Sequence, residues 1–250
     1  MDFARAKQLV HLYGPPIQAN QLVSLCMKAL LIPVKDPANA KTRLADLLTA
    51  DERRRLAWAM FEDVSRAVAG ARSADRVVLV SSFAPATRRA RGFGWDVLTE
   101  ASQISESASV DWASRVLAQR GFDVAMRLPA DLPLVRAEDI DALLSTELNA
   151  PAALLVPSRE GTGTNAIIRT PPALFPSRFG PNSLALHKEE ASRVGVDCVV
   201  VNNDRIALDV DEPADVESLM ELGHGTESFD ALVEMGMAAR LVSRKASQRT

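Results

Sequence analysis

The sequence predicts a single α/β domain in which a mostly parallel, Rossmann-like sheet is sandwiched between helices. Short apolar segments alternate along the chain with segments of helical periodicity, a pattern typical of strand–helix–strand units with right-handed crossovers. The longest apolar runs are broken by Lys28, Pro33 or Pro157 before they reach the length of a membrane span. No internal repeat and no long Gly/Ser linker interrupts the alternation.

The first half of the chain opens with an apolar strand over 28–34 that ends near Pro33 and leads into a polar loop. A helix follows, because Thr49 and Glu52 form a capping box and apolar residues then recur at three- and four-residue spacing up to Gly70. A buried strand comes next over 76–82. The later elements of this half are a helix over 85–91, a strand over 95–98, a helix over 108–120 and a strand over 122–128.

The second half keeps the same alternation up to a helix that starts at Pro213. Its predicted elements are a helix over 137–147, strands over 152–156 and 165–169, a helix over 183–193, a strand over 196–201, a strand end at 209–211 and a helix over 213–222. We interpret residues 27–223 as the domain and 224–250 as a frayed tail. Residues 1–26 read as an extension or a misassigned start, with a genuine N-terminal helix as the alternative.

Composition narrows the classes of partner. The 250 residues contain 29 Lys and Arg against 32 Asp and Glu, which gives a net charge of -3 and no basic block for binding duplex nucleic acid. No segment is apolar enough for a membrane span. Two cysteines, Cys26 and Cys198, are too few for a disulfide framework and lack metal-type spacing, which favours a reducing cytoplasm. The sequence leaves the oligomeric state open, with a homodimer as one alternative.

The loop after the first strand is the first candidate site, because ligands of open α/β sheets bind beyond the carboxyl ends of the strands. It carries three cations, Lys35, Lys41 and Arg43. These side chains can gather a polyphosphate and offset the charge of a transferring phosphoryl group. It is not a Walker loop, since no Gly-Lys-Ser/Thr occurs in the chain. A solvated charged loop is the alternative interpretation.

Acidic residues supply the second and third candidates. Asp131 follows a predicted strand and is flanked by Pro129 and Pro133, which stiffen the turn. Asp209 and Asp211 alternate at a predicted strand end, so that both carboxylates face one side. Such oxygen ligands suit a hard cation like Mg²⁺. The alternatives are ordinary acids at helix N-termini, with Asp211 as an N-cap before Pro213.

A glycine- and hydroxyl-rich segment, Gly161-Thr162-Gly163-Thr164-Asn165, is the fourth candidate, together with the start of a predicted helix at Ser183. Glycines let backbone amides approach an anion, and a helix N-terminus favours negative charge. A hairpin turn is the alternative for the glycines. The three histidines are scattered, and His187 is expected on a helix surface. The tryptophans, including Trp58, are expected in the core.

Taken in order, several segments of residues 27–222 resemble the 2-phospho-L-lactate, phosphoenolpyruvate or 3-phospho-D-glycerate guanylyltransferases of coenzyme F420 biosynthesis. The Gly-Thr-Gly-Thr and Phe-Gly-Pro motifs are the most specific part, whereas generic nucleotidyltransferases share only the first loop and the Asp. The matching segments are Pro33-Val34-Lys35, Ala40-Lys41-Thr42-Arg43-Leu44, Ala130-Asp131-Leu132-Pro133-Leu134, Gly161-Thr162-Gly163-Thr164-Asn165-Ala166, Phe179-Gly180-Pro181-Asn182-Ser183, His187, and Leu208-Asp209-Val210-Asp211 with Pro213.

The resemblance implies a three-layer nucleotidyltransferase-type sandwich related to molybdopterin guanylyltransferase. It also implies GTP, Mg²⁺ and a phosphorylated three-carbon acid as ligands, with a product that a deazaflavin transferase consumes. The implied nucleotide-binding residues are Pro33, Val34, Lys35, Lys41, Arg43 and Asp131, of which Lys35, Arg43 and Asp131 are catalytic. The implied metal ligands are Asp131, Asp209 and Asp211, and the implied acceptor-binding residues are Thr164, Gly180 and Ser183.

One segment departs from the family pattern. Many relatives carry Gly-Leu-Asn before the central helix, where this chain has the segment from Gln103 to Asp111. We expect this segment near the base or ribose, which leaves the preference for GTP open along with the choice of acceptor. The alternatives are a molybdenum-cofactor or sugar-phosphate nucleotidyltransferase, a nucleotide-sugar glycosyltransferase with Asp209-Val210-Asp211 as its metal motif, and a non-catalytic nucleotide sensor.

Overall fold

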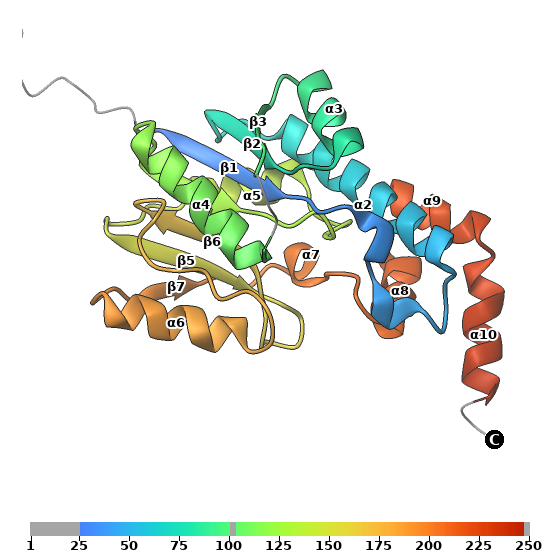
Figure 1. Cartoon of the computed structure of the whole chain (residues 1–250). Coiled ribbons are helices and arrows are strands. Elements are labelled where there is room, and N and C mark those ends of the chain that lie inside the picture. Colours follow the sequence, from blue (N-terminus) through green and yellow to red (C-terminus); the bar gives the residue numbers. More distant parts are fainter. Residues whose placement is uncertain (1–25, 101–103, 248–250) are drawn as a thin grey trace, which may run out of the picture.

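The computed structural model describes residues 26–100 and 104–247, so the predicted N-terminal extension lies almost wholly outside the described residues. The sheet has the strand order β3-β2-β1-β4-β6-β5-β7 (Figure 1). All neighbouring pairs are parallel except those of β6 with β4 and β5, which confirms the mostly parallel sheet. The strands are β1 (Lys28–Pro33), β2 (Arg76–Val80), β3 (Asp96–Leu98), β4 (Val124–Arg127), β5 (Ala152–Pro157), β6 (Thr164–Thr170) and β7 (Cys198–Val200).

Helices cover both faces of the sheet, and α8, α9 and α10, which follow the last strand, pack together with α2 in a separate cluster. Most of them lie where the periodicity of the sequence predicts, with bounds that differ by a few residues. They are α2 (Ala50–Gly70), α3 (Ala84–Gly92), α4 (Glu106–Gln119), α5 (Ala137–Leu144), α6 (Ser183–Arg193), α7 (Asp204–Ala207), α8 (Pro213–Leu222), α9 (Glu227–Glu234) and α10 (Met237–Ser247), with the short 3-10 helices η2 (Pro37–Asn39) and η3 (Thr42–Leu44).

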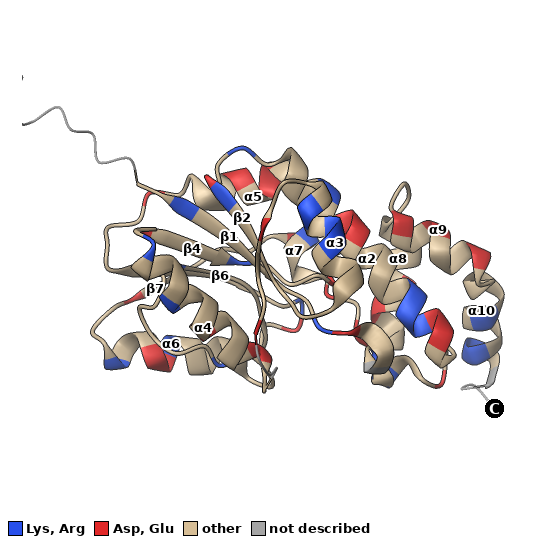
Figure 2. Cartoon of the chain, turned by 45° about the horizontal axis from the view of Figure 1, so that its top comes forward, with Lys and Arg blue, Asp and Glu red and all other residues tan. Residues whose placement is uncertain are grey.

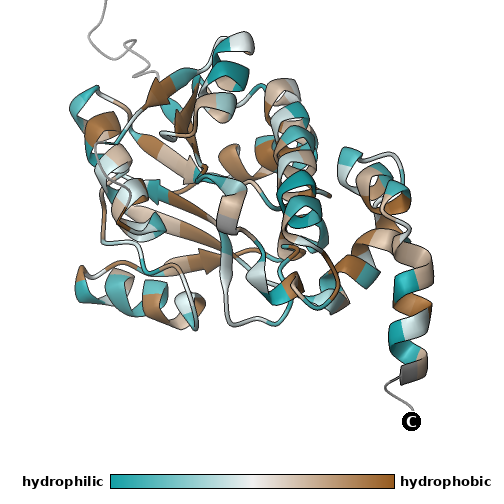
Figure 3. Ribbon diagram, turned by 45° about the vertical axis from the view of Figure 1, so that its right-hand side comes forward, coloured by the Kyte–Doolittle hydropathy of each residue, from teal (hydrophilic) through white to brown (hydrophobic). Residues whose placement is uncertain are grey.

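The strands are buried on both faces, and alternation along each strand assigns its residues to one layer or the other. On β1, Leu30 and Ile32 pack in the cluster that contains α2, α3, α5 and α7, whereas Ala29 and Leu31 pack against α4. On β5, Leu155 faces α6. In Figure 3 the central strands are largely brown, the colour of hydrophobic residues, whereas the surrounding helices carry more of the teal, hydrophilic residues. The three-layer arrangement is therefore confirmed.

The start of α2 follows from its sequence. The Thr49 hydroxyl accepts a hydrogen bond from the Glu52 backbone N–H at 3.3 Å, and the Glu52 carboxylate accepts one from the Thr49 N–H at 2.8 Å. This is the predicted capping box, which satisfies donors that the first turn of a helix leaves free. The box fixes where α2 begins, and so it fixes the length of the loop between β1 and α2 that lines the site.

The predicted frayed tail is wrong for residues 227–247, which form α9 and α10. Leu232 is fully buried in a second core cluster with residues of α2 and α8. The Asp63 carboxylate on α2 accepts hydrogen bonds from the backbone N–H groups of Glu227 and Ser228 at 2.7 and 2.9 Å. Arg240 of α10 donates to Glu52 at 2.6 Å. The sequence did not predict this packing, because its last residues are polar and the partners of Leu232 lie on the distant helices α2 and α8.

Charges of both signs are spread over the helices, for example on α2 and α6 (Figure 2). Within the described ranges, none of the helices combines the length and the apolar character that crossing a membrane requires. Both cysteines, Cys26 and Cys198, are free thiols.

Candidate active site

Two adjoining cavities lie at the carboxyl ends of β1 and β4. The first cavity has a volume of about 410 Å³ and the second about 470 Å³. Two ligands bound in them would meet at their common wall, where acids and a buried arginine lie side by side. The residues that line both cavities are Glu106, Arg127, Pro129, Asp131 and Asp211.

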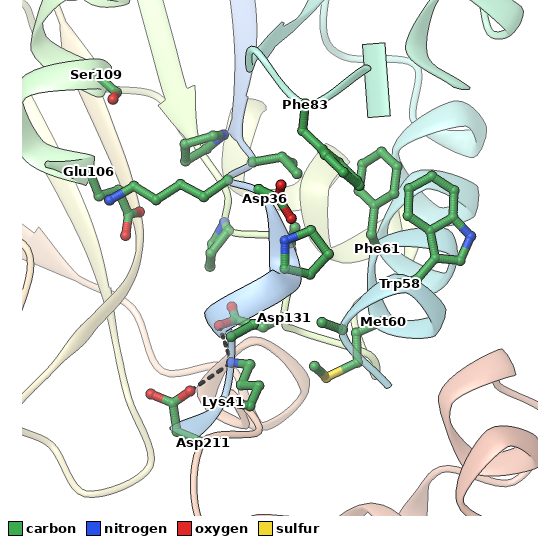
Figure 4. A pocket seen from close by; sticks show the side chains of 18 of the residues that line it. Asp36, Lys41, Trp58, Met60, Phe61, Phe83, Glu106, Ser109, Asp131 and Asp211 are labelled. Carbon is green, nitrogen blue, oxygen red and sulfur yellow. Dashed lines mark hydrogen bonds and ion pairs between the residues drawn. The ribbon is translucent and has the colours of Figure 1, made fainter. Parts of the chain in front are cut away.

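The first cavity lies between the loop after β1 and helix α2. Pro33, Val34, Lys35 and Lys41 line it, as do Trp58, Phe61 and Phe83. Figure 4 shows these three aromatic side chains grouped on one side, away from Lys41 and its acidic neighbours. The Trp58 and Phe61 rings are 5.3 Å apart. Trp58 packs on the core as expected, and it also forms part of a cavity wall, which its apolar pattern did not predict.

Lys41 lies between two carboxylates. Its Nζ atom is 2.6 Å from both Asp131 Oδ2 and Asp211 Oδ1, as the dashed lines in Figure 4 show. Burial alone would lower the pKa of Lys41, but the two carboxylates hold it above its ordinary range. Its backbone is left-handed, with φ of 53°, between η2 and η3. The structure thus pairs Lys41 with the acids, whereas the resemblance implied a triphosphate contact.

The three aspartates of this group outnumber Lys41, which bonds to two of them, and the other buried cation at the wall, Arg127, is paired with Glu106. Burial alone would raise the pKa of Asp131, but Lys41 keeps it below its ordinary value. Burial, and then the charges of Asp131 and Asp211, raise the pKa of Asp209 from 3.8 to about 6. The exposed Arg43 approaches this group only at 4.0 Å from Asp211 Oδ2. The negative charge is therefore incompletely neutralised at the wall between the cavities.

The predicted strand end at 209–211 is wrong, because residues 204–207 form helix α7 and the chain then runs extended without joining the sheet. Val210 is fully buried, and its backbone N–H donates to the Asp131 carbonyl at 3.3 Å. Asp209 and Asp211 still flank it by alternation. Asp211 is not the N-cap of α8, since Glu212 takes that position, so the Asp211 side chain is available to Lys41.

The second cavity lies between the β5–β6 hairpin and the start of α6. Thr164, Gly180 and Ser183 line it together with Arg43, Asp131, Asp209 and Asp211. The hairpin alternative for the glycines is confirmed, since Gly161–Gly163 joins the antiparallel strands β5 and β6. Gly180 has φ of 126°, a conformation that side chains disfavour. Helix α6 begins after Asn182 without a side-chain cap.

His187 is not on the helix surface as predicted, because its side chain is fully buried. Its Nε2 atom accepts a hydrogen bond from the Arg178 backbone N–H at 2.8 Å, and Nδ1 is 3.0 Å from Thr164 Oγ1. Burial, and then the charges of Arg169 and Arg127, lower its pKa from 6.5 to about 4. The position of His187 in a predicted helix did not reveal its burial, because only the packing of α6 turns this residue toward β6.

Arg127 and Glu106 are site residues that the sequence analysis missed. Arg127 ends β4, is buried, and forms an ion pair with Glu106. Its guanidinium lies 4.1 Å from the centre of the Phe179 ring. The sequence did carry a signal for Arg127 as a site residue, since a charged side chain directly follows the apolar run 124–126 at the end of a predicted strand. Glu106 and Ser109 of the departing segment line the first cavity, while Gln103 lies outside the described residues.

The described residues contain no group of three or more His, Cys, Asp or Glu side chains already arranged to hold a metal ion. Two of the three acids that the resemblance assigned to metal, Asp131 and Asp211, are bridged by the Lys41 ammonium. The third, Asp209, accepts a hydrogen bond from Asn165 Nδ2 at 3.0 Å.

Residues 27–249 match the family model described as guanylyl transferase CofC like. The chain is 33% identical over 77% of its length to the phosphoenolpyruvate guanylyltransferase of Conexibacter woesei, of which it covers 86%. It is 32% identical over 81% of its length to the 2-phospho-L-lactate guanylyltransferase of Methanothermobacter thermautotrophicus (88% of that protein). It is 30% identical over 76% to the 3-phospho-D-glycerate guanylyltransferase of Colwellia psychrerythraea (90% of that protein).

Solved structures share the fold. A Desulfovibrio desulfuricans G20 protein, whose description suggests a nucleotide-diphospho-sugar transferase, superposes with a TM-score of 0.67 at 17% identity, over 83% of this chain and 94% of that protein. A nucleotidyl transferase of Methanothermobacter gives 0.54 at 12% identity, over 78% and 96%. At these identities the likeness shows the fold alone, and it confirms the nucleotidyltransferase-type sandwich.

Proposed function

We propose that this chain, which belongs to the CofC-like guanylyl transferase family, transfers GMP from GTP to the phosphate of a three-carbon acid and releases pyrophosphate. The observation that carries the proposal is the pair of cavities with a common wall at Asp131 and Asp211. A transfer between two anionic substrates requires both to be held at one place, with their charges offset.

The first cavity suits the nucleotide. Its aromatic side, with Trp58, Phe61 and Phe83, offers flat apolar surface for a base or ribose, while Lys35 offers charge to phosphates. Arg43, exposed on the same loop, faces the acids at the second cavity, where it can reach a phosphate as it transfers. Lys35 and Arg43 are the cations that we assign to the triphosphate.

The second cavity suits the acceptor. Thr164 supplies a hydroxyl, Gly180 a backbone that a small ligand can approach, and Ser183 the positive end of α6. The curated relatives are named for phosphoenolpyruvate, 2-phospho-L-lactate and 3-phospho-D-glycerate. We propose a member of this class of phosphorylated three-carbon acids, within coenzyme F420 biosynthesis, and a deazaflavin transferase as the consumer of the product.

Asp131, Asp209 and Asp211 fit a divalent cation by their chemistry. All three offer the oxygen ligands that Mg²⁺ prefers, and the raised pKa of Asp209 marks negative charge that Lys41 does not neutralise. We propose that these residues hold Mg²⁺ with the substrate phosphates. When bound, the ion would offset charge on the transferring phosphoryl group.

The chemistry needs no protein nucleophile. A phosphate oxygen of the acceptor, already anionic at neutral pH, forms a bond to the α-phosphorus of GTP, while the bond from that phosphorus to the bridging oxygen breaks. Pyrophosphate leaves with the bonding electrons. The barrier then comes from repulsion between the two anions and from the need to orient them. Lys35 and Arg43 lower the repulsion, and the walls of the two cavities orient the substrates.

The test is to incubate the protein with GTP, Mg²⁺ and each three-carbon phosphate separately, and to identify the product by mass together with pyrophosphate. We expect a guanylylated acid with at least one acceptor. Parallel reactions with molybdopterin, a hexose phosphate and a nucleotide sugar cover the other enzyme classes. Saturable GTP binding without pyrophosphate from any acceptor would instead indicate a nucleotide sensor.

A further inference from the structure

His187 joins two parts of the second cavity. One ring nitrogen, Nδ1, is 3.0 Å from the hydroxyl oxygen of Thr164 on β6, and the other, Nε2, is 2.8 Å from the backbone nitrogen of Arg178. Arg178 precedes Phe179 and Gly180, which line the cavity. The Phe179 ring meets the imidazole edge-on at 5.0 Å. A single buried side chain therefore contacts both a strand and a loop of the proposed acceptor site.

The direction of these hydrogen bonds follows from the donors available. A backbone N–H can only donate, so Nε2 must accept and carries no proton. A neutral imidazole then carries its proton on Nδ1, which donates to Thr164 Oγ1. The Thr164 oxygen is used as an acceptor by this bond, and it makes no other hydrogen bond to the residues that the structure describes. Its own hydrogen is left to donate elsewhere.

We propose that His187 is a positioning residue that fixes the Thr164 hydroxyl as a hydrogen-bond donor to the acceptor substrate in the second cavity. The inference rests on the proposed function, which supplies an anionic three-carbon acid with carboxylate and phosphate oxygens. A hydroxyl left to rotate could accept as well as donate. The bond from His187 takes one of the two lone pairs of the Thr164 oxygen and turns the hydroxyl hydrogen away from the ring. The hydroxyl then favours a ligand oxygen that accepts over an uncharged ligand that presents a donor.

Burial and the neighbouring arginines keep the His187 ring neutral, the form in which Nδ1 donates and Nε2 accepts. The ring is fully buried, and after burial the charges of Arg169 and Arg127 contribute most to lowering its pKa. Asp111 opposes them, but it already accepts hydrogen bonds from Ser177 and forms an ion pair with Arg169. The pKa of His187 is about 4, so the neutral form predominates at neutral pH.

Two substitutions separate the two ring nitrogens. The amide nitrogen of Asn in His187→Asn can replace Nδ1 and keep the bond to Thr164, whereas the carbonyl of Gln in His187→Gln can replace Nε2 and keep the bond from Arg178. We expect His187→Gln to raise KM for the acceptor by about tenfold or more, because a hydrogen bond to a charged group is weakened, and His187→Asn to stay within about threefold of wild type. KM for GTP should stay within about twofold in both variants.

A double-mutant cycle with Thr164→Val tests whether His187 acts through Thr164. In that background the His187→Gln change should add less than about twofold to KM for the acceptor, since the hydroxyl that His187 holds is gone. Additive effects of the two substitutions would overturn the proposal, as would equal losses in His187→Gln and His187→Asn. Melting temperatures of each variant, with and without GTP, identify a variant that simply fails to fold.

A measurement without turnover tests the premise directly. The chain contains three histidines, so ¹⁵N-histidine labelling and long-range correlation spectra can assign the tautomer of each ring, with His187→Asn used to assign the resonance. We expect Nδ1 of His187 to carry the proton at neutral pH. A proton on Nε2 would overturn the inference even in an active enzyme. Lack of product from the wild type with every acid would refute the proposed function instead, and the two failures are therefore distinguishable.

Discussion

Replacing Asp209 by asparagine should make the ligand-free protein more stable at neutral pH while impairing its activity. Asp209 lies close enough to Asp131 and Asp211 for their charges to raise its pKa, and Lys41 is bonded to the other two acids and not to it. Asparagine keeps an oxygen that can accept from Asn165 Nδ2 and removes the negative charge. The substitution therefore isolates the electrostatic cost of the third acid.

The magnitude follows from the pKa. Burial and the two neighbouring acids raise the pKa of Asp209 from 3.8 to about 6, and each pKa unit corresponds to about 1.4 kcal/mol, so the charged form costs up to roughly 3 kcal/mol. Because Asp209 is only partly buried, we expect about 1–2 kcal/mol after solvent screening. The folded state binds its proton more tightly than the unfolded state, so this cost is complete above pH 6, shrinks as the pH falls and vanishes below about 4.

The assay is urea unfolding of wild type and Asp209→Asn in EDTA, near pH 7.5 and near pH 4. The variant should be the more stable at the higher pH, and the two should converge at the lower one. Adding Mg²⁺ should stabilise the wild type more than the variant. Glu147→Gln, which removes a charge from an exposed position after α5, is the control and should change little at either pH. A variant no more stable than wild type near pH 7.5 would refute the proposed repulsion among the three carboxylates.

Three further predictions follow from the site and the fold. Asp131→Asn should lower kcat by at least about 100-fold, roughly 3 kcal/mol, while a normal circular dichroism spectrum shows that it folds; near wild-type pyrophosphate release would contradict its assignment. Lys35→Ala should raise KM for GTP by about tenfold, whereas Lys188→Ala on the exposed face of α6 should not, and equal effects would argue against a triphosphate contact. Leu232→Ala should cost about 2–5 kcal/mol in urea unfolding, against less than about 1 kcal/mol for the exposed neighbour Val233→Ala; similar small losses would show that α9 does not belong to the folded core.

The sequence was sufficient for the elements whose signals are local. The capping box at Thr49 and Glu52 located the start of α2, because both hydrogen bonds form within four residues of chain. The apolar runs located the strands β1 and β2, since strands covered by helices on both faces carry few polar residues. The motif-bearing residues Lys41, Asp131 and Asp211 were expected at one site, and the structure places them in contact.

Only the tertiary structure determined which charged groups pair with each other and which side chains are buried. The sequence could not show that Lys41 pairs with Asp131 and Asp211, 90 and 170 residues away, because its cation is equally available to a phosphate until the fold brings the acids to it. The same holds for His187, whose helical position fits a surface or a buried role alike. Leu232 likewise gains its partners only when α9 packs on α2 and α8. Local periodicity fixes the backbone of each element, whereas charge pairing and burial are set by groups that the chain brings together from distant positions.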